Sequence, residues 1–183
     1  MSSQDIITYC APTLVGIKTA NIFNERYETE DELKKSISHF NHSFKDYGLR
    51  MTSLGEKNNR ALIYVYREQA LIRDFKNQLS QELLKQYGYD SKDIKNSLHT
   101  LTKRIGNSSS FPHEIGLFLG YPPEDVKGFI DNKARNYKFI GYWKVYGDLD
   151  KALKSFHSYD HAQKILLDRL KNGYTLKQLV IHK

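Results

Sequence analysis

Two segments of strand-like composition, residues 49–54 and 61–66, lie on either side of the polar stretch 55–59. Aliphatic and aromatic segments that flank a short polar turn are typical of an antiparallel hairpin. The second segment, Ala-Leu-Ile-Tyr-Val-Tyr, is almost entirely apolar or aromatic, so it predicts a central strand rather than an edge strand.

Helical spacing of apolar residues accounts for most of the remaining chain. Thr29 and Glu32 have the Thr-x-x-Glu spacing of a capping box, and apolar residues then recur at helical spacing as far as Phe44, which predicts a helix over 30–46. Similar patterns predict helices at 69–86, 91–105, 112–119, 123–131, 148–170 and 175–180. A short helix is expected at 3–9. Pro12 is expected to prevent a helix through 10–18, which would form an extended turn or a short strand, because proline lacks the N–H that a helix needs.

Residues 139–146 predict a third strand, far in sequence from the hairpin. Alternate side chains of a strand point to opposite faces, so Tyr142, Lys144 and Tyr146 would share one face, and Trp143 and Val145 the other. We therefore expect an α+β fold. Its small antiparallel sheet of about three strands, the hairpin plus this distant third strand, would be covered by several helices.

The length of 183 residues and the absence of a linker predict a single compact domain, 1–183. Hydrophobic residues make up 39% of the chain and charged residues 27%, which excludes a disordered chain. No apolar run approaches the roughly 20 residues of a spanning helix, and the first residues lack the layout of a signal peptide. We expect a soluble, cytoplasmic protein with no membrane partner.

Cys10 is the only cysteine, which excludes an intrachain disulfide and a metal site built from cysteines. The pairs His39/His42 and His157/His161 lack further ligands, so no metal site is predicted. The net charge of +7 makes anionic metabolites, acidic proteins and nucleic acid the candidate partners. The cations are spread over several predicted helices among acidic residues, as on solvated helix faces, so nucleic acid is a minor alternative.

Three phrases of the sequence are distinctive: Cys-Ala-Pro-Thr-Leu-Val-Gly-Ile-Lys at 10–18, Phe-Pro-His-Glu-Ile-Gly-Leu-Phe-Leu-Gly-Tyr-Pro at 111–122, and Gly-Tyr-Trp-Lys-Val-Tyr at 141–146. In this order they resemble an uncharacterised bacterial family, domain-of-unknown-function family 3793, found mainly in anaerobes. The resemblance covers nearly the whole chain, but it does not indicate which reaction, if any, the protein catalyses or which cofactor it uses. Members of the family often have a cysteine near the position of Ala162, so a partner thiol for Cys10 is absent here.

The candidates for catalysis are Cys10, His113 and Glu114. A thiol becomes a reactive thiolate beside a positive charge or a base, which Lys18 or His113 would supply if the first two phrases meet. The alternative is that Cys10 is a buried apolar side chain. His113 and Glu114 begin a short helix opened by Pro112, where the pair could move protons at an anion site. The alternative is that His113 satisfies a loop carbonyl while Glu114 complements the helix dipole.

The candidates for ligand binding are Lys18, Arg67, Tyr142 and Lys144. Lys144 would lie between Tyr142 and Tyr146 on one strand face, and Arg67 would approach it from the neighbouring strand. Such a face could hold a phosphate or carboxylate, with the rings against its apolar part. The alternative is an ordinary solvated sheet face.

We expect the three phrases to converge on one pocket that binds, and could act on, a small anionic ligand. The competing hypothesis is a non-catalytic interaction module that docks on an acidic protein or nucleic acid through a basic, tyrosine-rich surface. The reaction, any cofactor and the oligomeric state stay open.

Overall fold

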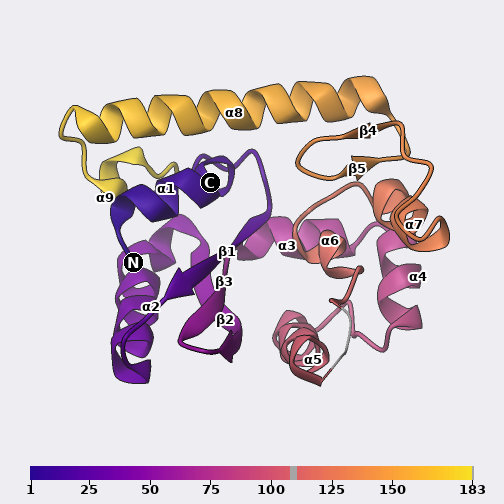
Figure 1. Cartoon of the computed structure of the whole chain (residues 1–183), viewed down its shortest axis with the longest axis horizontal. Helices are drawn as coiled ribbons and strands as arrows, with labels where there is room; N and C mark the ends of the chain where they lie inside the picture. Colours follow the sequence, from indigo (N-terminus) through magenta and orange to yellow (C-terminus); the bar gives the residue numbers. More distant parts are fainter. Residues whose placement is uncertain (108–110, 183) are drawn as a thin grey trace. The chain divides into compact units, whose positions relative to one another are not determined.

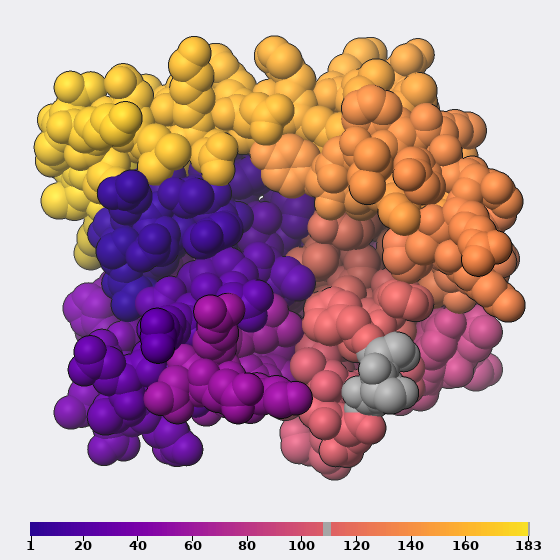
Figure 2. Space-filling view, in the orientation of Figure 1, coloured from indigo at the N-terminus to yellow at the C-terminus, as the bar shows by residue number. Residues whose placement is uncertain are grey.

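The computed structural model describes residues 1–107 and 111–182 of the chain (Figures 1 and 2). It comprises two compact units: unit 1 is Met1–Gln69 with Tyr159–Lys183, and unit 2 is Ala70–Ser158. The predicted α+β class is confirmed, with a three-stranded antiparallel sheet in unit 1 and a two-stranded one in unit 2. The single domain expected from the sequence stays a prediction. Within the described ranges, no helix has both the length and the apolar character that crossing a membrane requires.

The sheet of unit 1 is built on the predicted hairpin. Strands β2 (Leu49–Lys57) and β3 (Arg60–Arg67) pair antiparallel, and β3 is the central strand, as predicted. Asn58 and Asn59 form the turn with φ values of 52° and 57°. Asparagine adopts positive φ more readily than most residues, which suits the tight two-residue turn between these strands.

The third strand of this sheet is β1 (Ala20–Arg26), which pairs antiparallel with the other edge of β3. The expectation that residues 139–146 supply this strand is wrong. The sequence of β1, Ala-Asn-Ile-Phe-Asn-Glu-Arg, is mostly polar. An edge strand can tolerate such a composition, because only part of it faces the core, and it then lacks the apolar alternation by which strands are recognised.

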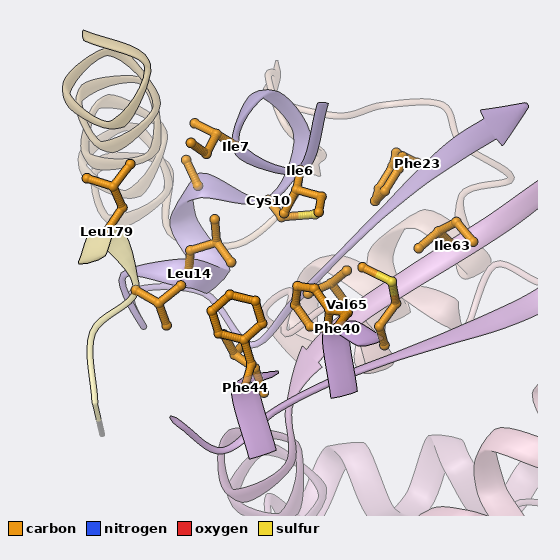
Figure 3. Packing of buried hydrophobic residues seen from close by; sticks show 14 of the residues in the cluster. Ile6, Ile7, Cys10, Leu14, Phe23, Phe40, Phe44, Ile63, Val65 and Leu179 are labelled. Carbon is orange, nitrogen blue, oxygen red and sulfur yellow. The ribbon is translucent and has the colours of Figure 1, made fainter. Parts of the chain in front are cut away.

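The core of unit 1 lies between the sheet and the helices α1 (Ser3–Leu14) and α2 (Glu30–Phe44) (Figure 3). The helix predicted at 30–46 is therefore confirmed. A short 3-10 helix, η1 (Lys45–Tyr47), follows α2, and α9 (Leu176–Leu179) adds Leu179 to the core. Residues from Tyr159 onward in the long helix α8 (Leu149–Lys171) also belong to this unit.

Helix α1 continues through Pro12 to Leu14, so the extended turn or short strand expected at 10–18 is wrong for residues 10–14. Proline removes the hydrogen bond to the carbonyl four residues earlier, which here is Thr8. The side-chain amide of Gln163 donates to the Thr8 carbonyl at 2.5 Å. A side chain distant in sequence thus replaces the missing helical bond.

Arg67, the last residue of β3, ties the end of α1 to the rest of unit 1. Its guanidinium is buried and donates to the carbonyls of Thr13 and Leu14, both at 2.7 Å, of Tyr47 at 3.0 Å and of Ile181 at 2.8 Å. The first two are terminal carbonyls of α1, which have no partner within the helix. A cation at this end also complements the helix dipole.

Unit 2 consists of short helices followed by a small hairpin. The helices are α3 (Glu68–Phe75), whose first two residues lie in unit 1, α4 (Gln78–Gln86), α5 (Ile94–Asn107), α6 (Ile115–Phe118), α7 (Pro123–Asp131) and the beginning of α8. The single helix predicted at 69–86 is wrong, because Asn77 interrupts it and caps α4 by accepting a hydrogen bond from the Ser80 amide at 3.1 Å.

The predicted strand at 139–146 folds back on itself. Strands β4 (Phe139–Ile140) and β5 (Lys144–Val145) pair antiparallel across a bend at 141–143. Gly141, in this bend, lies against the ring of Phe156 from α8, where a Cβ atom would overlap the ring. The bend therefore packs against α8 only because residue 141 has no side chain.

Replacing Arg67 with Met should lower the free energy of unfolding by about 3 kcal/mol or more, because four carbonyls each lose a hydrogen bond from a charged donor. Chemical denaturation measures this loss. Arg60→Met, at the exposed other end of β3, is the matched control and should change stability by no more than about 0.5 kcal/mol. Equal effects of the two substitutions would contradict the capping role of Arg67.

Candidate functional site

The candidate residues divide between the two units. Cys10, Lys18 and Arg67 lie in unit 1, whereas His113, Glu114, Tyr142 and Lys144 lie in unit 2. Convergence of the three phrases on one pocket stays a prediction. Each group is therefore described within its own unit.

Cys10 is fully buried in the core of unit 1, among apolar side chains of α1 and the sheet (Figure 3). Burial raises the pKa of its thiol far above the ordinary value, and the positive charge of Lys18 only partly opposes this. A protonated thiol is a poor nucleophile. These surroundings favour the alternative in which Cys10 is a small apolar core residue.

Lys18 and Arg67 direct their positive charges at backbone carbonyls. Lys18 is buried, and its ammonium donates to the carbonyl of Ala20 at the start of β1. Four of the five N–H groups of Arg67 are used by carbonyls, as described above. The expectation that Arg67 and Lys144 lie on neighbouring strands is wrong, because β3 pairs with β1 and β2 while β5 pairs with β4.

A pocket of about 380 Å³ opens in unit 1 beside the start of α1. Apolar residues of the core form part of its wall, and polar residues line its rim, among them Ser36, His39 and Lys177. None of the three unit 1 candidates lines it.

Glu114 lies in unit 2 as a buried carboxylate with two strong partners. Its Oε1 atom accepts hydrogen bonds from the Tyr89 hydroxyl at 2.8 Å and from Nε of Arg104 at 2.7 Å. Burial, followed by the contact with Glu114, raises the pKa of Tyr89. Arg104 also lies over the ring of Tyr87, 5.3 Å from its centre. Glu114 thus fixes α5 and the Tyr87–Tyr89 segment to the start of α6.

His113 is exposed and lies in different surroundings from its neighbour Glu114. Its imidazole contacts the ring of Phe129 in α7, with 4.9 Å between ring centres and a T-shaped geometry. The predicted cooperation between His113 and Glu114 has no support in these contacts, because the Glu114 carboxylate faces Tyr89 and Arg104.

Lys144 of β5 lies close to the same Phe129 ring. Its ammonium is 5.7 Å from the centre of that ring and 4.6 Å from the centre of the Tyr137 ring, and it donates to the Ala134 carbonyl at 2.9 Å. Among the described residues, no carboxylate lies within 4.0 Å of this ammonium. Phe129 thus brings two predicted site residues, His113 and Lys144, together.

The carbonyl that Lys144 binds belongs to an unusual loop. Lys133, Ala134 and Asn136 have positive φ values of 50°, 61° and 58°. Non-glycine residues rarely adopt this left-handed conformation, and each occurrence costs free energy that other contacts must offset. The hydrogen bond from Lys144 is one such contact.

Tyr146 of the hairpin segment has a buried hydroxyl group. Its ring packs over Gly128, whose missing side chain makes room for it, since a Cβ there would lie 2.5 Å from the ring. The Tyr146 hydroxyl is buried and has no hydrogen-bond partner within residues 1–107 and 111–182. Burial and the neighbouring Tyr137 and Asp125 raise its pKa. We call Phe129, Tyr137, Lys144 and Tyr146, with His113 beside them, the Lys144 site.

Tyr142 lies in the hairpin bend rather than beside Lys144 on a continuous strand. Its ring packs against Phe156, with 5.6 Å between centres, and its carbonyl accepts a hydrogen bond from the Tyr121 hydroxyl at 3.2 Å. Tyr137 and Phe129 are the rings that flank the ammonium. This role of Tyr137 and Phe129 is not apparent from the sequence, because a straight strand over 139–146 would place Tyr142 and Tyr146 beside Lys144.

Asp125, in the first turn of α7, positions the strand that carries Lys144. Its buried carboxylate accepts hydrogen bonds from the Trp143 indole and from the amides of Tyr146 and Gly147, each at 2.7 Å. The sequence alone does not single out Asp125. An aspartate near a helix start is usually explained by the helix dipole alone, so its position carried no special signal.

Metal ligands do not cluster in the part of the chain that the structure describes. No group of three or more His, Cys, Asp and Glu side chains there has a geometry that could hold a metal ion. The Lys144 site therefore offers a cation, a phenol and aromatic surfaces, which suit binding of an anion rather than a metal.

In the folded protein, the Cys10 thiol should resist alkylation and react only at the rate of unfolding. Mass spectrometry of alkylated protein across a denaturant series measures this rate. The stability of the wild type relative to Cys10→Ala should also fall as pH rises above 9.0, the ordinary thiol pKa, because only the unfolded thiol then ionises. Rapid alkylation under native conditions would contradict the burial of Cys10.

The comparisons with known proteins identify a family. The family model described as "Protein of unknown function (DUF3793)" matches residues 6–180. No curated protein and no solved structure matches the chain. Because the match covers nearly all of the sequence, the chain belongs to the DUF3793 family.

Proposed function

We propose that this protein binds a small anionic ligand at the Lys144 site, in the cytoplasm. The observation that carries the proposal is the buried Tyr146 hydroxyl without a hydrogen-bond partner among the described residues. Native proteins rarely bury such a group unsatisfied, and leaving it so costs about 1–3 kcal/mol. Because this hydroxyl is closed to solvent, a bound anion would supply its acceptor once the side chains that cover it move aside.

The charge of Lys144 supports an anion rather than a neutral ligand. An ammonium group has three N–H donors, and the Ala134 carbonyl accepts from one of them. Among the described residues no carboxylate neutralises the charge, as noted above. The remaining donors are available for a phosphate or carboxylate oxygen.

The aromatic rings around Lys144 indicate which shape of anion would fit the site. Tyr137 and Phe129 make cation–π contacts with the ammonium, which fix its position without neutralising its charge. His113, at the edge of Phe129, adds an exposed imidazole that can donate a hydrogen bond to the same ligand. Anions with a small apolar or planar body suit this combination of rings and donors.

The proposal covers binding and assigns no reaction. The thiol of Cys10 is buried and protonated, and the Glu114 carboxylate is already occupied by Tyr89 and Arg104. Two of the three candidates for catalysis, Cys10 and Glu114, therefore have structural roles.

Tyr146→Phe should separate binding from stability, because it removes only the hydroxyl. In the ligand-free protein this change should leave the free energy of unfolding equal or raise it by up to about 1 kcal/mol, since no hydrogen bond is lost. The same change should weaken binding of inorganic phosphate, used as a probe, by about tenfold. Denaturation and titration of the Trp143 indole signal by NMR measure the two effects.

Matched variants test each half of this prediction. Tyr89→Phe removes a buried hydroxyl that donates to Glu114, and should destabilise the protein by about 1–3 kcal/mol. Lys144→Met should abolish the phosphate response, whereas Lys154→Met, at an exposed lysine of the same unit, should leave it intact. The proposal fails if Tyr146→Phe costs as much stability as Tyr89→Phe, or if Lys144→Met still responds to phosphate.

A further inference from the structure

An exposed basic and aromatic segment leads into the hairpin of unit 2. From Lys133 to Lys144, both included, the chain has four basic residues and no acidic residue. Residues 135–142 are all exposed. Large side chains account for much of that exposure: Tyr137 is 41% exposed, Phe139 42%, Ile140 58% and Tyr142 37%. This segment is orange in Figures 1 and 2. We call these residues the 133–144 strip.

The aromatic rings of the strip are held in place rather than mobile on a loose loop. Phe139 and Tyr142 both pack against Phe156, with ring centres 6.3 Å and 5.6 Å away and interplanar angles of 29° and 33°. Tyr137 is fixed by the ammonium of Lys144. Rings that are ordered before binding lose little conformational entropy when a ligand stacks on them.

Cations alternate with these rings along the strip. Lys133 and Arg135 precede Tyr137, and Lys138 separates Tyr137 from Phe139. All three cations are exposed. Since no carboxylate interrupts them, the strip is complementary to a row of negative charges spaced along a flexible chain.

We infer that the 133–144 strip binds single-stranded nucleic acid. Exposed rings beside cations are the features with which proteins bind single strands, because every base has a face that can stack and every nucleotide a phosphate. Lys133, Arg135 and Lys138 would contact phosphates, while Tyr137, Phe139 and Tyr142 would stack on bases. This inference goes beyond the anion site: the strip shares Tyr137 and Lys144 with that site, but stacking of bases on its rings does not require a small anion to bind there.

The sequence made nucleic acid a minor alternative because cations are dispersed over the chain as a whole. The distribution of cations over the whole chain does not show that the 133–144 strip has only basic charges and that its aromatic rings are exposed close together in the sequence. Local density of charge, rather than total charge, governs contact with phosphates.

The test is fluorescence anisotropy of a labelled oligothymidine of about 16 nucleotides with the full chain. Three phosphate contacts predict that log K falls against log salt with a slope of about −2. Tyr142→Ala should weaken binding about tenfold through loss of stacking. Ile140→Ala removes the most exposed apolar side chain, which has no ring to stack, and should change binding by less than about twofold.

Other variants and probes make the inference falsifiable. Tyr146→Phe, outside the strip's exposed rings, should leave oligonucleotide binding intact even if it loses phosphate binding, so the two proposals fail separately. Thermal melts confirm that each variant is folded. The inference is overturned if the oligonucleotide does not bind at low salt, or if Tyr142→Ala binds as the wild type does. It is also overturned if Ile140→Ala is the damaging change and the protein instead binds phosphatidylglycerol vesicles, which would indicate a lipid surface.

Discussion

The buried carboxylate of Asp125 positions the residues on both sides of Lys144 in unit 2. It accepts one hydrogen bond from the Trp143 side chain and two from the amides that follow β5, so the residues between them are held from both sides. Hydrogen bonds to a charged acceptor contribute about 1.5–3 kcal/mol each, more than neutral ones. Lys144 lies inside this clamp and Tyr146 forms its edge. A loop that costs free energy, with three residues at positive φ, can therefore persist beside them.

Unit 1 depends on a buried charge of the opposite sign in a comparable way. The Arg67 guanidinium is satisfied by four backbone carbonyls, much as Asp125 is satisfied by two backbone amides and an indole. Buried charges usually require an opposite charge, but aligned backbone dipoles can take that role. Such partners tie distant segments together: Arg67 joins β3 to the end of α1, to η1 and to the C-terminal residues. As a consequence, the charged groups of Arg67 and Asp125 are both engaged in structural hydrogen bonds and do not serve to bind a ligand.

The sequence predicted correctly those helices and strands in which the spacing of apolar residues shows which face is buried. The helix at 30–44, the β2–β3 hairpin and α7 at 123–131 were predicted nearly residue for residue. Failures occurred where a distant partner overrides the local rule. Pro12 stays helical because Gln163 supplies the missing donor, and 139–146 bends because Gly141 fits against Phe156. The same holds for the candidate site. Lys144 and His113 could be identified from the sequence as unusual polar residues. The roles of Asp125, Tyr137 and the Tyr146 hydroxyl depend on tertiary packing, which no local sequence pattern shows.

Amide hydrogen exchange of Asp125→Ala tests the central claim, that this one carboxylate positions the Lys144 site. Removing its oxygens should greatly accelerate exchange at Tyr146 and Gly147, whose amides donate to it, while the amides of β3 in unit 1 stay protected. Lys127→Ala, at an exposed residue of the same helix, is the control and should leave both sets protected. Unchanged protection at Tyr146 and Gly147 in Asp125→Ala, or an equal loss of protection in β3, would contradict the account.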